Sequence, residues 1–132
     1  MTRHELRYKT MTILYQTFLY DSNNIEYDVN SIINEQLKES NKFVNELVNG
    51  VITNQKDISD LANKYLVEWD IERLSKVDKA IISIGIYELN YTDTPSVVSI
   101  NEAIELSKKY SDEKVTKMIN ATLDKIFHSE EE

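Results

Sequence analysis

Apolar residues recur three and four positions apart along most of the chain, which is the spacing of one face of an α-helix. The clearest stripe lies in segment 43–52 and consists of Phe43, Val44, Leu47, Val48, Val51 and Ile52. Similar stripes predict helices over about 2–20, 25–37, 57–66 and 115–126.

The segment that follows Ser75 has a different pattern, because its apolar residues cover more than one helix face: Val77, Ala80, Ile81, Ile82, Ile84, Ile86 and Leu89. A helix of this kind needs neighbours all around it, so we expect it to be central. Ser75 and Asp78 fit a capping box at its start. Gly85 in its interior costs about 1 kcal/mol relative to alanine, and close approach of another helix would explain it.

Loop-forming and helix-capping residues predict two more helix boundaries. Residues 92–95 read as a loop, and a second capping box from Ser99 to Glu102 predicts that the next helix starts at Ser99. Residues 110–112 separate that helix from the last one. We expect Trp69 to be a buried anchor between two halves of the molecule.

Glycine and proline are too scarce for many turns: the chain has 2 glycines and 1 proline. The prediction is therefore all-α, with about seven helices joined by short polar loops. We expect one domain over residues 1–128, with halves of about 1–68 and 69–128, and an acidic tail over 129–132.

Composition disfavours several classes of function. The 132 residues include no cysteine, which excludes thiol catalysis and indicates a reducing cytoplasm. No apolar run approaches the roughly 20 residues of a membrane span. Glycine-rich phosphate loops are absent and the two histidines lie near opposite ends. We expect no enzyme activity, no metal and no cofactor.

Charge is distributed unevenly. The net charge of −8 disfavours bulk attraction to nucleic acid, because non-specific affinity comes from cations that neutralise phosphates. Residues 6–20 nevertheless contain no acid. The first helix is thus the one region with the local positive character that any contact with RNA would need.

The most recognisable motifs lie in the second half of the chain, in segments 74–82, 87–89, 100–108 and 119–125 and at Pro95. This set of motifs closely resembles the NusB family of bacterial transcription antitermination factors. Earlier pieces in the family's order are Leu14-Tyr15-Gln16, Gly50-Val51, Tyr65-Leu66 and Trp69.

This resemblance implies two perpendicular three-helix bundles and a defined set of partners. Those partners are the ribosomal protein NusE, single-stranded RNA of the boxA type, and the antitermination complex of RNA polymerase. Some members of the family self-associate, so a homodimer is a further expectation. An acidic surface would suit docking to a basic ribosomal protein.

Candidate RNA contacts fall on three helices, and each has a structural alternative. In the first helix they are Arg3, Arg7, Lys9 and, less strongly, His4; the alternative is that they only solubilise a terminal helix. Arg3 and Arg7 are one i, i+4 step apart and so share a face. The others are Tyr15, which could instead be buried; Asp78, which could instead only cap its helix; and Lys114 and Lys117, which could simply be solvated.

Two other functions stay open. A protein–protein adaptor with weak or lost RNA binding is favoured by Glu5 and Leu6, which interrupt a helix that is arginine-rich in the family. A NusB-like domain also precedes the catalytic domain of some ribosomal RNA cytosine methyltransferases. The lack of cysteine and of a glycine-rich cofactor loop disfavours that role.

Overall fold

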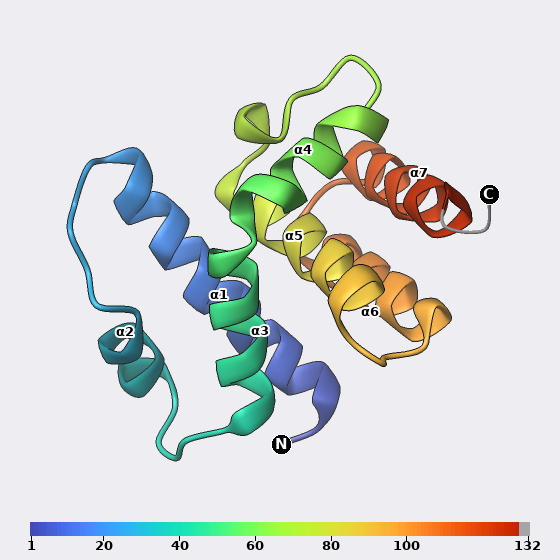
Figure 1. Ribbon diagram of the computed structural model, residues 1–132. Helices are drawn as coiled ribbons and strands as arrows, with labels where there is room; N and C mark the ends of the chain where they lie inside the picture. The colour runs from blue at the N-terminus through green and yellow to red at the C-terminus, as the bar shows by residue number, and fades with distance from the viewer. Residues whose placement is uncertain (130–132) are drawn as a thin grey trace.

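The computed structural model describes residues 1–129, which form seven α-helices and one turn of 3₁₀-helix with no strand (Figure 1). The helices are α1 (Arg3–Ser22), α2 (Val29–Gln36), α3 (Lys42–Thr53), α4 (Gln55–Tyr65), α5 (Lys76–Tyr91), α6 (Ser96–Tyr110) and α7 (Glu113–Ser129). The 3₁₀ turn η1 (Ile71–Arg73) lies between α4 and α5. The predicted fold class is confirmed. The acidic tail was expected to span residues 129–132. Ser129 is instead the last residue of α7, and residues 130–132 lie outside the described part of the chain.

Helix α5 is the centre of the fold, as the sequence pattern predicts. It packs against α1, α3 and α4, which precede it in the chain, and against α6 and α7, which follow it. A methyl group on Gly85 would lie 2.9 Å from Cδ1 of Leu123 in α7 and 3.6 Å from Cβ of Ala103 in α6. The close helix approach expected at this glycine is therefore confirmed. The division into halves near residue 68 stays a prediction.

Two helix starts differ from the sequence prediction. Helix α2 begins at Val29, capped by the carboxylate of Asp28, because Asn24 turns the chain with a φ of 56° and leaves Ile25 exposed. Helix α6 begins at Ser96 directly after Pro95, and not at Ser99. A proline at this position has no N–H group to lose and a fixed φ, so it starts a helix well. Ser99 is instead buried inside α6.

The prediction that Trp69 is a buried anchor is wrong. Glu68 has a φ of 64°, and Val67 and Trp69 on either side of it are exposed, Trp69 to 40%. The interior positions near this loop belong to Leu66, Ile71 and Leu74. None of the helices in the described part of the chain combines the length and hydropathy needed to cross a membrane.

Candidate nucleic-acid interface

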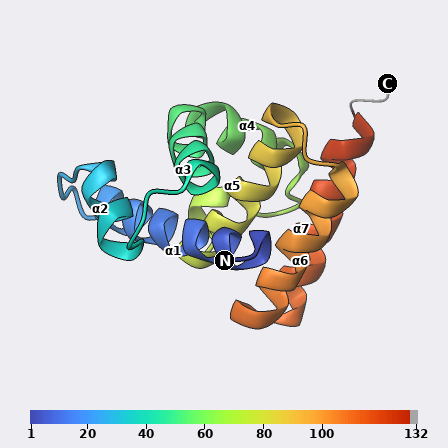
Figure 2. The same cartoon turned by 90° about the horizontal axis from the view of Figure 1, so that it is seen from below.

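The amino-terminal end of α1 lies beside α3, α5 and α6, as seen from below in Figure 2. The side chain of Thr2 caps the helix by accepting a hydrogen bond from the backbone N–H of Glu5. The basic residues predicted to contact RNA follow within two turns. The structure gives each of them a different environment.

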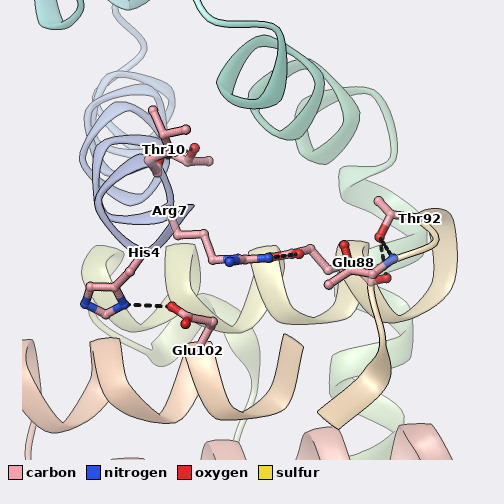
Figure 3. A network of polar contacts seen from close by, with 8 residues as sticks. His4, Arg7, Thr10, Glu88, Thr92 and Glu102 are labelled. Atoms are coloured by element: carbon pink, nitrogen blue, oxygen red, sulfur yellow. Dashed lines mark hydrogen bonds and ion pairs between the residues drawn. The ribbon is translucent and has the colours of Figure 1, made fainter. Parts of the chain in front are cut away.

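Arg7 is buried and paired. Its Nε and Nη2 atoms donate to the two carboxylate oxygens of Glu88 in α5, each over 2.8 Å (Figure 3). The side chains of Arg7 and Glu88 are 5% and 1% exposed. The hydrogen bonds that Arg7 donates to Glu88, and the negative charge of Glu88, raise the pKa of Arg7 against the opposing effect of burial. The prediction that Arg7 contacts phosphate is therefore wrong: its guanidinium is already neutralised and faces the interior.

His4 is exposed but engaged. Its Nδ1 atom lies 2.7 Å from Oε2 of Glu102 in α6, and this contact joins the start of α1 to α6 (Figure 3). Glu102 was expected to close a cap on Ser99, but Ser99 lies inside the helix and the carboxylate faces His4 instead. A phosphate would have to compete with Glu102 for this histidine.

Arg3 and Lys9 are the cations of this region that keep their charge available. Arg3 is exposed, and its guanidinium carbon lies 4.1 Å from the centroid of the Phe43 ring in α3. No carboxylate pairs with Arg3 or Lys9 within residues 1–129. Lys9 is half-buried and borders a hollow of about 480 Å³ together with Lys38, a further cation that the sequence analysis did not single out.

Tyr15 and Asp78 contrast in accessibility. Tyr15 is 39% exposed on α1, so the alternative of a buried tyrosine is wrong and its RNA contact stays a prediction. Asp78 is 7% exposed. Its backbone N–H donates to Oγ of Ser75, which confirms that Ser75 caps α5. The buried Oδ1 of Asp78 has no hydrogen-bond partner, so the carboxylate does not return the second bond of a capping box.

Lys114 and Lys117 lie on α7, which packs against α4, α5 and α6. Lys117 pairs with Glu113 over 3.3 Å. Lys114 has no such partner among the described residues and borders a hollow of about 400 Å³ that also contains Trp69. The two lysines therefore stand on a helix apart from α1, and their RNA contacts stay predictions.

The residues that set these environments were not predicted from the sequence to lie at this site: Glu88, Glu102 and Phe43. One signal was available for Glu88, because an acid inside the most apolar helix is almost never buried without a partner. Within residues 1–129, no three His, Asp or Glu side chains gather closely enough to hold a metal ion.

The fold and this site define a class of protein: an all-helical domain whose first helix presents a few open cations beside exposed aromatic side chains. The sequence profile of the NusB family matches residues 4–128. The chain belongs to the NusB family.

Named relatives agree across nearly the whole length. The transcription antitermination protein NusB of Campylobacter jejuni strain RM1221 is 38% identical over 125 residues, which cover 93% of each chain. Its counterpart from Bacillus subtilis strain 168 is 37% identical over 129 residues, with 96% of this chain and 95% of that protein covered.

Solved structures share the fold. T. maritima NusB superposes with a TM-score of 0.83 at 31% identity, covering 97% of this chain and 92% of that one. NusB in a crystal structure of NusB and NusE with double-stranded RNA superposes with a TM-score of 0.79. That chain is 22% identical, with 98% of this chain and 99% of that one covered, so it supports the fold alone.

Proposed function

We propose that this protein is a bacterial transcription antitermination factor that binds boxA-type single-stranded RNA together with the ribosomal protein NusE. Its relatives from Campylobacter jejuni and Bacillus subtilis are named transcription antitermination proteins. The observation that carries the RNA part is the pair of open cations on α1, Arg3 and Lys9, in a chain whose net charge is −8.

The same charges explain why a partner is required. Two open cations on α1 neutralise about two phosphates, which gives little affinity at physiological salt. A basic partner docked beside α1 would add positive charge, and the acidic body of this protein would attract it. RNA binding should therefore be a property of the pair.

This protein offers a suitable docking surface for its protein partner at the hollow between the 66–70 loop and α7. Exposed Val67 and Trp69 lie there beside Val115 and Met118, and the hollow measures about 400 Å³. Contiguous exposed apolar side chains of this kind mark interaction sites in proteins that otherwise stay monomeric. We assign this groove to NusE.

Trp69 makes the assignment testable, because it is the only tryptophan in the chain. NusE docking in the groove should shift the emission maximum of Trp69 to shorter wavelength as water leaves the ring. A Trp69→Ala variant should bind NusE more weakly, by a factor of at least ten, since exposed tryptophans in interface centres are frequent hot spots. Unchanged emission at saturating NusE would place the partner elsewhere.

The deciding experiment for the function measures the affinity of a boxA-like RNA for this protein alone, for NusE alone and for the mixture. We expect the mixture to bind at least tenfold more tightly than either protein. Equal affinity of the mixture and of NusE alone would contradict the proposal.

A protein–protein adaptor without RNA binding is the second candidate. It is favoured because Arg7 is paired with Glu88 and His4 contacts Glu102. These contacts leave only two of the four basic residues predicted on α1 available to RNA. Tight NusE binding together with indifference to every boxA variant would select it.

The remaining features of the proposal follow from the family. We infer that the protein acts without catalysis, in the bacterial cytoplasm, as part of the antitermination complex of RNA polymerase. Sedimentation measurements with and without NusE would test whether the protein forms a homodimer.

A further inference from the structure

A hollow of about 510 Å³ lies between α3 and the carboxyl end of α5, and aromatic residues of both helices line it. Phe43 contributes one ring, and the guanidinium of Arg3 stacks on that ring. Tyr87 and Tyr91 contribute the others; their rings are stacked, with centroids 5.2 Å apart and planes inclined by 11°. Tyr91 is 43% exposed, so it presents aromatic surface to solvent.

Gly50 of α3 makes room for the ring of Tyr87 and so permits the tyrosine stack. A methyl group on Gly50 would overlap the ring of Tyr87, so that ring can lie directly against the backbone of α3 only because residue 50 is glycine. Tyr91 follows one helical turn after Tyr87 and stacks on it. The exposed ring therefore has a fixed orientation, which lowers the entropy lost when a planar ligand binds.

Several side-chain oxygens around the hollow are free hydrogen-bond acceptors. The amide nitrogens of Asn49 and Asn54 donate to the backbone oxygens of Asn45 and Gly50, each over 2.8 Å. Their amide oxygens have no partner in the described part of the chain, nor has the carboxylate of Asp93. Acceptors in this position suit a ligand that offers N–H donors. They repel a phosphate.

We propose that this hollow binds one unpaired nucleobase that carries an exocyclic amino group, from the RNA strand whose phosphates lie along α1. The exocyclic amino group of adenine, cytosine or guanine can donate two hydrogen bonds to these acceptors, whereas uracil offers only its single ring N3–H. Arg3 connects the two sites, because its guanidinium is an open cation and also stacks on Phe43 at the edge of the hollow. Stacking of a splayed base on an aromatic side chain is the usual mode of single-strand recognition.

The inference rests on the proposed function and is tested with the complete complex of this protein and NusE. A boxA-like RNA is made in a series in which each nucleotide in turn is replaced by an abasic one. With the unchanged protein, we expect one position to lose roughly tenfold in affinity through the stack on Tyr91. With Tyr91→Leu, that position should lose no more than its neighbours.

Tyr91→Phe is the matched control, since it keeps the ring and should reproduce the unchanged protein. The same abasic profile for Tyr91→Leu and for the unchanged protein would overturn the inference while leaving the proposed function intact. Failure of the unchanged complex to bind RNA would overturn both. Weaker NusE binding by Tyr91→Leu without any change in the RNA profile would mean that the hollow contacts protein, which also overturns it.

The preference for an amino-bearing base is tested at the RNA position that the abasic series identifies. Uracil there should bind more weakly than adenine, cytosine or guanine, and Asp93→Asn should narrow that difference. Simple removal of a negative charge would instead strengthen all RNAs equally. A uniform gain with the base preference unchanged would overturn the assignment of the amino-bearing base.

Discussion

The guanidinium of Arg7 in α1 and the carboxylate of Glu88 in α5, 81 positions apart in sequence, form a buried bidentate ion pair with two 2.8 Å contacts. The pair joins the first helix to the central helix at the end where Arg3 is open to solvent. It therefore positions the candidate RNA surface without being part of it. Arg7 therefore stabilises the fold, whereas Arg3 and Lys9 on the same helix are available to bind RNA phosphates.

We expect Arg7→Met and Glu88→Gln each to destabilise the fold by about 3–5 kcal/mol, because either change leaves a buried charge or its donors without a partner. Urea unfolding followed by circular dichroism measures the loss. The double variant Arg7→Met/Glu88→Leu removes both charges and should recover much of it. Lys56→Ala, which breaks an exposed pair with Asp60, is the control and should leave the urea midpoint unchanged. Single variants as stable as the unchanged protein would show that the pair does not hold α1.

The all-helical class and the central helix followed from the sequence because they depend on local periodicity. The environment of Arg7 did not, since an i, i+4 spacing with Arg3 says which helix face a residue shares and not what packs against that face. Glu88 comes from a distant segment, and only the tertiary arrangement brings it to Arg7. The prediction for Trp69 was wrong for a related reason. The backbone at Glu68 is left-handed, and because residue 68 is not glycine the sequence does not indicate this turn.

Arg3→Gln and Lys9→Gln test the candidate RNA surface through salt dependence. In the complex with NusE, each variant should bind boxA-like RNA more weakly and reduce the slope of log K against log salt by about 0.7, the value for one phosphate on a single strand. The change should be similar for different RNA sequences, because phosphate contacts carry no sequence information. Lys56→Gln on α4 serves as the control for loss of a distant cation. Slopes equal to that of the unchanged protein would remove α1 from the interface.

Gly50→Ala tests the packing of Tyr87 on α3. The added methyl group overlaps the tyrosine ring, and overpacking of this kind costs about 1–3 kcal/mol. The loss should be smaller in a Tyr87→Ala background, which gives a double-mutant cycle for the contact. Gly85→Ala is the matched comparison. There the only atoms closer than an ordinary contact are at the flexible end of Leu123, the nearest at 2.9 Å, and alanine's helix preference of about 1 kcal/mol offsets part of the strain. A larger loss at Gly85 than at Gly50 would contradict this account.

Tyr27 predicts how stability changes at alkaline pH. Burial, followed by the neighbouring carboxylate of Asp21, raises the pKa of Tyr27 to about 12 from the ordinary value of 10.0. Between these values the unfolded chain loses the phenolic proton while the folded protein keeps it, so unfolding becomes easier as pH rises. Stability is therefore fully present below pH 10 and falls toward pH 12. The whole interval would correspond to about 2.7 kcal/mol, and solvent screening at this partly exposed side chain reduces it to about 1 kcal/mol.

The measurement is the free energy of unfolding in urea at several pH values between 10 and 12, compared for the unchanged protein and Tyr27→Phe. Phenylalanine keeps the ring and has no proton to lose, so its stability should fall less steeply over this range. All other residues are the same in the two proteins, so their contributions cancel in the comparison. Parallel curves would show that Tyr27 ionises equally in the folded and unfolded chains, against the effect of burial and of Asp21.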